Sequence, residues 1–118
     1  MEPELARGEG RTRIKLLSNS MGDDLVVYIY NDKAHVGAVA MAEHDSQSGR
    51  VSTSVITRPG HKDDAIAAKA AHAIGKAVRG PVCVIAGVHI DNITQEEIDT
   101  VTANAEAVVE DFICSFVR

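Results

Sequence analysis

The residues of this chain best suited to chemistry are three histidines, each in a short polar segment between apolar runs. An imidazole can exchange a proton near neutral pH, bind a metal ion or hydrogen-bond an anion. The segments are 34–37 with His35, 58–64 with His61, and 87–92 with His89. If the fold brings them together, these residue types predict a ligand-binding site or a general-base site.

The second and third segments both lie where we expect a strand to pass into a helix. Backbone amides at a helix N-terminus favour anions such as phosphate, because they lack helical partners and the helix dipole is positive there. One shared cleft would collect the following side chains: His61, Lys62, Asp63, Asp64, His89, Asp91 and Asn92. Helix capping would also explain Asp63 and Asp64, and a turn would explain Asn92.

A metal site is a second interpretation of the same residues. His89 and Asp91 are two positions apart, so they point to the same side of an extended segment, as two ligands of one metal would. His61 and Asp63 are candidates for further ligands. Without a third ligand, His89 and Asp91 are equally well explained as a hydrogen-bonded couple.

Composition narrows the function classes. A net charge of -5 and 3% aromatic residues argue against nucleic-acid binding, which needs a basic surface and stacking side chains. The sequence contains no Gly-rich phosphate loop, nucleophile elbow, paired-cysteine zinc motif or His-Glu-x-x-His motif. No apolar run approaches the ~20 residues of a membrane helix, and nothing resembles a signal peptide, so we expect a cytoplasmic protein.

Five apolar runs predict strands. The first four cover 11–17, 25–30, 36–42 and 51–57, and the short turns between them favour an antiparallel meander. Small residues in 36–42 would let a flat ligand or another backbone come close. The fifth run, 82–86, is continuously apolar and bounded by glycines, which suits a strand buried on both faces.

Two segments have helical periodicity. Residues 64–79 place apolar side chains, many of them alanine, on one stripe. Thr94 and Glu97 have capping-box spacing, and apolar residues then recur every three or four positions. The order β-β-β-β-α-β-α predicts a two-layer α+β sandwich, with about five mainly antiparallel strands and two helices on one face. Residues 1–10 are expected to form a flexible tail before a single domain over 11–118.

The three histidine segments resemble the successive signatures of the LpdD-like family. This is the prenylated-flavin chaperone domain, a small accessory protein type associated with gallate and other UbiD-class decarboxylases. The matching stretches are 34–39, 59–64 and 86–94, and the resemblance covers about residues 14 to 117. The family's first motif has a proline before the histidine, where this chain has Ala34. The family is similar in fold to proteasome assembly chaperones, which implies a homodimer.

The resemblance implies an accessory protein that binds prenylated flavin mononucleotide and assists its delivery to a UbiD-type decarboxylase, with that enzyme or a flavin prenyltransferase as partner. The cofactor-binding residues would then be His35, Gly37, Gly60, His61, Lys62, Asp64 and Asn92. A divalent metal ion would be held by His61, Asp63, His89 and Asp91, and would offset the phosphate charge.

Two alternatives stay open. The first is a small metal- or histidine-dependent enzyme in which His89, oriented by Asp91, acts as general base, with His61 or Lys62 stabilising the developing charge. The second is a protein-binding assembly chaperone whose polar motifs only shape turns. The sequence favours a non-catalytic accessory role over an enzyme, because it carries no common catalytic signature.

Overall fold

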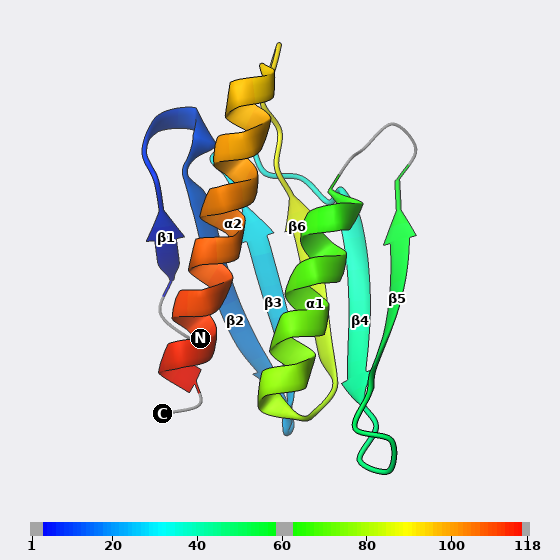
Figure 1. Ribbon diagram of the computed structural model, residues 1–118. Helices are drawn as coiled ribbons and strands as arrows, with labels where there is room; N and C mark the ends of the chain where they lie inside the picture. The colour runs from blue at the N-terminus through cyan, green and yellow to red at the C-terminus, as the bar shows by residue number, and fades with distance from the viewer. Residues whose placement is uncertain (1–3, 59–62, 117–118) are drawn as a thin grey trace.

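A six-stranded sheet lies under two helices in the computed structural model, which describes residues 4–58 and 63–116 (Figure 1). The strands are β1 (Leu5–Arg7), β2 (Ile14–Met21), β3 (Asp24–Tyr30), β4 (Ala38–His44), β5 (Val51–Thr57) and β6 (Val82–Gly87). The helices are α1 (Asp64–Val78) and α2 (Gln95–Phe116), and η1 (Gly10–Thr12) is a short 3-10 turn. This arrangement confirms the predicted two-layer α+β class, with one strand more than expected.

The additional strand, β1, lies in the segment that we expected to form a flexible tail. It pairs antiparallel with β2, with Leu5 opposite Leu16. The Arg7 guanidinium donates two hydrogen bonds to Asp111 of α2, at 2.6 and 2.8 Å. The strand has only three residues, which is too short for local periodicity to reveal it.

Strand β6 occupies the middle of the sheet. The order is β1-β2-β3-β6-β4-β5, and β6 runs parallel to β3 and antiparallel to β4. The predicted meander is therefore right for the hairpins β2–β3 and β4–β5 but wrong between β3 and β4. After β5, the chain passes through α1 and returns to the sheet centre, where β6 inserts between β3 and β4. The short polar segments between the strands do not reveal this insertion.

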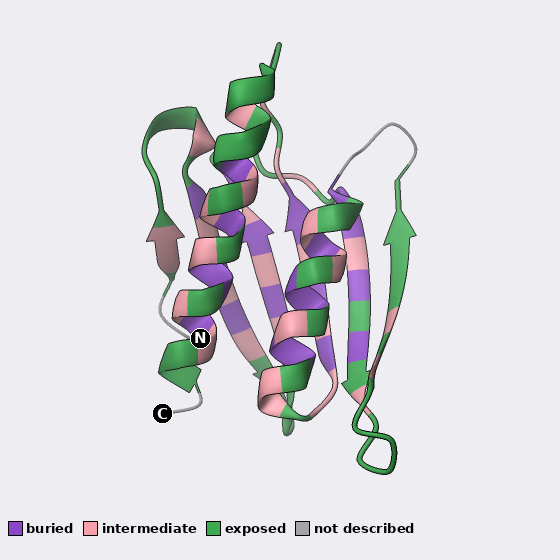
Figure 2. Ribbon diagram, in the orientation of Figure 1, coloured by how far each residue is buried: buried purple, intermediate pink, exposed green. Residues whose placement is uncertain are grey.

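Both helices cover the same face of the sheet, where buried residues alternate along the strands (Figure 2). Helix α1 packs on β4, β5 and β6, and α2 packs on β1 and β2. Ala38, Ala40 and Ala42 of β4 are buried under α1. A Cβ atom on Gly75 of α1 would lie 3.2 Å from the Ala42 Cβ atom. Of the two expected uses of the small residues of β4, the close approach of another backbone is therefore the one seen, and that backbone is a helix. Neither described helix has the length and apolarity needed to cross a membrane.

The other face of the sheet, here called the open face, is covered by no described element. It carries an apolar row in which neighbouring strands place their side chains opposite one another: Leu17, Tyr28, Ile85, Val39 and Ile56. Ile56 is 76% exposed and Met41, in the adjacent row, is 55% exposed. The expectation that β6 is buried on both faces is wrong within one chain, since Cys83 and Ile85 are only half-buried.

Candidate functional site

The candidate site forms where the loop after β3 crosses the end of β6. A Cβ atom on Gly87 would lie 1.4 Å from the backbone oxygen of His35. A Cβ atom on Gly37 would lie 1.8 Å from the Asp63 Oδ2 atom. Both glycines are therefore required by close approach, and they bring the His35 loop, the end of β6 and Asp63 to one place.

Asn31 fixes the backbone of His89. Its side chain is buried, with 3% exposed, and its Oδ1 atom accepts a hydrogen bond from the His89 N–H at 3.1 Å. Its Nδ2 atom donates to the His89 carbonyl oxygen at 2.8 Å and to the Arg11 carbonyl oxygen at 3.3 Å. The side-chain amide thus pairs with both backbone polar groups of His89, as the backbone of a neighbouring strand would. We expected 31–33 to form only a turn. A single asparagine after a strand gives no signal that distinguishes a turn residue from one whose side chain pairs with a distant backbone.

His89 and Asp91 form a hydrogen-bonded couple, with 2.8 Å between His89 Nε2 and Asp91 Oδ1. Lys33 binds the other Asp91 oxygen at 3.1 Å. The hydrogen bond from His89, and then that from Lys33, lower the pKa of Asp91 below its ordinary value. The rings of His35 and His89 meet edge to face, with 5.5 Å between centroids. Lys33 is a second site residue that the sequence did not reveal.

Asp63 lies immediately before α1 but does not cap it with its side chain. The carboxylate is buried and its Oδ1 atom accepts a hydrogen bond from the Val88 N–H at 3.1 Å. The capping explanation is therefore wrong for Asp63, because the side chain turns toward the end of β6 instead. This bond joins the second polar segment to the third, as the shared-cleft prediction requires.

These elements enclose a cleft of about 400 Å³, here called the histidine cleft. It is lined by His35, Asp63, Ala65, Ile66, Val88, His89, Ile90, Ile93, Ile98, Val101 and Thr102. Asp64 and Asn92 are exposed and do not line it, and Asn92 has a φ of 53°, which fits the turn explanation. Gly60, His61 and Lys62 lie outside the described residues, so their predicted roles remain predictions.

The predicted metal ion gains no support from the described part of the chain. Within 4–58 and 63–116, no group of three or more histidine, cysteine, aspartate or glutamate side chains could hold one. His89 and Asp91 bind each other, and Asp63 binds the Val88 amide. The fourth predicted ligand, His61, lies outside the described residues.

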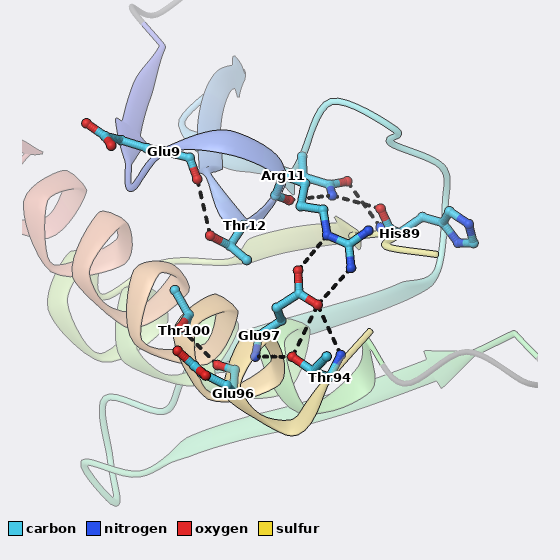
Figure 3. A network of polar contacts seen from close by, with 9 residues as sticks. Glu9, Arg11, Thr12, His89, Thr94, Glu96, Glu97 and Thr100 are labelled. Carbon is cyan, nitrogen blue, oxygen red and sulfur yellow. Dashed lines mark hydrogen bonds and ion pairs between the residues drawn. The ribbon is translucent and has the colours of Figure 1, made fainter. Parts of the chain in front are cut away.

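The start of α2 is tied to the same site (Figure 3). The capping box is confirmed: the Glu97 N–H donates to Thr94 Oγ1, and the Thr94 N–H donates to Glu97 Oε1, both at 3.1 Å. Arg11 donates to both Glu97 oxygens at 2.5 and 2.7 Å, while its carbonyl accepts from Asn31. The His89 imidazole points away from this network (Figure 3), and its Nε2 atom contacts Asp91 instead.

The Glu97 contacts predict a specific pH dependence of stability. The hydrogen bond from Arg11, and then that from Thr94, lower the pKa of Glu97 from 4.5 to about 2. A lowered folded-state pKa stabilises the fold above pH 4.5, and this contribution is lost as the pH falls toward 2. We expect the free energy of unfolding of Glu97→Gln, measured with urea, to fall less across this pH window than that of the unmodified protein. An identical pH profile for Glu96→Gln and Glu97→Gln would contradict the assignment, since Glu96 makes no such pair through its carboxylate among the described contacts.

Comparisons with known proteins agree with this fold and with these motifs. A solved structure described as "Crystal Structure of a Novel Chaperone Complex for Yeast 20S Proteasome Assembly" is similar over 98% of each chain, with a TM-score of 0.61 and 13% identity. At this identity, the likeness shows the fold alone. No curated protein matches the sequence. The model of the prenylated flavin chaperone LpdD-like domain matches residues 8–116, and the chain therefore belongs to the LpdD-like prenylated flavin chaperone family.

Proposed function

We propose that this protein binds prenylated flavin mononucleotide in the histidine cleft and assists its delivery to a UbiD-class aromatic acid decarboxylase, in the cytoplasm. The observation that carries the proposal is the meeting of two motif histidines in one cleft, with 5.5 Å between the rings of His35 and His89. A cleft of about 400 Å³ lies within the ~300–1,000 Å³ range of small-molecule sites.

The described residues fit such a cofactor in chemistry. The walls are mainly apolar, through Ile66, Ile90, Ile93 and others, which suits a fused ring system. The ring of His35 lines the cleft, and His89 Nδ1, the ring nitrogen that Asp91 does not contact, can share a hydrogen bond with a polar ring atom or with a phosphate. Asp91 adds little repulsion toward an anion, because Lys33 and His89 already bind its two oxygens.

The other predicted cofactor residues take supporting places in this proposal. Gly37 keeps room for the Asp63 carboxylate behind the cleft. Asp64 lies at the start of α1 and Asn92 lies between β6 and α2. Gly60, His61 and Lys62 would complete the phosphate end, as the sequence predicts. The bound flavin supplies no reaction here: the proposed role of the chain is to hold the group and shield it from water and oxidants.

A homodimer formed through the open face is part of the proposal. The open face crosses five strands with an apolar row, and exposed apolar patches of this kind mark protein interfaces. A second copy would bury Ile85 and Cys83, and this would satisfy the continuous apolar pattern of β6. Dimerisation would leave the helix side of the histidine cleft open, because Ile66 and Val101 lie on the helices of the opposite layer. His35 also borders the open face, beside Leu17 and Ile85, so a second copy would lie close to the cleft.

An anaerobic titration tests the cofactor proposal. We expect prenylated flavin mononucleotide to change its absorbance saturably on addition of the full-length protein, and to raise the melting temperature of that protein. The variant His35→Gln/His89→Gln should weaken binding at least tenfold, which corresponds to about 1.4 kcal/mol. His72→Gln is the matched control, since His72 is exposed on α1 and does not line the cleft. No change in absorbance or melting temperature with the unmodified protein would sink the proposal.

An enzymatic role is the second candidate, favoured by the 2.8 Å contact between His89 and Asp91 that would orient a general base. Both side chains are well exposed, at 47% and 59%, so the couple lacks the desolvation typical of catalytic pairs. If this candidate is right, His89→Ala should abolish turnover of an aromatic acid substrate and leave the melting temperature unchanged.

A further inference from the structure

The two helices leave an apolar groove between them on the outer side of the molecule. They lie side by side over one face and run in the same direction (Figure 1). Because α1 packs on β4 to β6 and α2 on β1 and β2, each helix covers one part of the sheet. The groove, here called the interhelical groove, has a volume of about 320 Å³. It shares Ala65, Ile66 and Thr102 with the histidine cleft and therefore continues from it.

The floor of the interhelical groove is made of small and aliphatic side chains. Ala70 and Ala73 come from α1, and Ala105 and Val109 come from α2. The lining residues of α1 run from Ala65 to Ala73, which corresponds to about 12 Å, or two helical turns. Alanine on both sides leaves space for the apolar side chains of another helix, the geometry by which amphipathic helices bind in grooves.

An acidic stripe borders this groove along α2. Exposed residues at spacings of three and four form the stripe: Glu96, Asp99, Ala103, Glu106 and Glu110. Glu106 and Glu110 also line the groove. Lys69 of α1 reaches across to Glu106 at 3.8 Å, but both side chains are more than 60% exposed, so this pair is weak and can be exchanged. The electrostatic complement of this border is a row of basic side chains.

We infer that the interhelical groove binds an amphipathic helix of a partner protein. The apolar stripe of that helix enters the alanine floor, and its basic flank faces Glu106 and Glu110. This adds a protein-docking surface next to the cofactor site and separate from the open face, so that one partner could contact both the groove and the cofactor.

A peptide experiment with charge reversal tests this inference. The probe is a synthetic 14-residue helix with leucines at spacings of three and four and lysines along one flank, together with the same helix carrying glutamates. We expect the lysine peptide to shift backbone amide NMR signals of 65–73 and 102–110 in the full chain, and to bind less tightly as salt rises. Glu106→Lys/Glu110→Lys should weaken the lysine peptide at least tenfold and allow the glutamate peptide to bind.

Two matched substitutions of alanine by arginine distinguish binding in the groove from electrostatic attraction to the acidic stripe. Ala73→Arg fills the groove, whereas Ala103→Arg places the same charge on the acidic stripe outside the groove lining. We expect the first to abolish peptide binding and the second to reduce it at most threefold. Three results would overturn the inference: no saturable binding of the lysine peptide, equal losses in both variants, or shifts centred on the open face. A change of oligomeric state confined to Ala73→Arg would also overturn it, by assigning the groove to a second copy of this chain.

Discussion

Replacing Gly87 by alanine is expected to destabilise the protein by about 3 kcal/mol, at the upper end of overpacking effects. The new Cβ atom would lie 1.4 Å from the backbone oxygen of His35, and a backbone cannot rotate out of the way as a side chain can. The loop that carries His35 must therefore move off β6. Urea unfolding should show a lower midpoint with an unchanged slope, and cofactor binding should fall with it.

Gly80→Ala is the matched control for this substitution. Gly80 stands at the other end of the same strand, and the nearest atom to its new Cβ would be 4.0 Å away, at the Val78 carbonyl. We expect a change within about 0.5 kcal/mol, as for surface positions without special contacts. Equal effects at Gly80 and Gly87 would contradict the close approach of the His35 loop to β6.

Replacing Asn31 by alanine is expected to remove the support of His89. The substitution deletes the hydrogen bond that Asn31 Oδ1 accepts from the His89 N–H and the two that Asn31 Nδ2 donates, to the His89 carbonyl and to the Arg11 carbonyl. Backbone groups left without partners cost roughly 1–3 kcal/mol of stability. We also expect cofactor affinity to fall at least tenfold, because the His89 ring loses its fixed position. Urea unfolding and flavin titration measure the two effects.

Two variants isolate the role of the Asn31 amide. Asn31→Asp keeps the acceptor for the His89 N–H, but it loses both donated bonds and turns a buried carboxylate oxygen toward two carbonyl oxygens, so it should destabilise the protein at least as much as alanine. Asn19→Ala removes an asparagine from the open face whose contact with Tyr28 is long, at 3.5 Å, and should change neither quantity. Unchanged flavin affinity in Asn31→Ala would show that His89 does not depend on this amide.

The sequence predicted those parts of the fold that leave a local pattern. The helical stripes, the capping box of Thr94 and Glu97, and the β-branched runs were all sufficient to place elements within a few residues. Strand β1 was missed because its three residues are too few to show strand periodicity. The insertion of β6 between β3 and β4 was missed because strand periodicity identifies a strand but not its neighbours.

The sequence predicted those site residues whose side-chain chemistry and spacing together indicated a site. His89 and Asp91 were found because their spacing places them on one side, and His35 was found through its motif. Asn31 and Lys33 were missed, because a polar residue after a strand is usually just part of a turn. For Asp63 the sequence left a cleft role, a metal ligand and helix capping open, and it did not predict that the carboxylate binds the Val88 amide across the cleft. Hydrogen bonds between residues far apart in one chain depend on tertiary structure and leave no pattern in the sequence.

Amide NMR of the isotope-labelled full chain during an anaerobic titration with prenylated flavin mononucleotide is the most direct test of the proposed function. We predict saturable shifts centred on His35, Val88 and His89, with the strongest changes around the histidine cleft and none specific to β5. Shifts centred on the open face, or no shifts at cofactor concentrations that saturate a UbiD-class decarboxylase, would contradict it.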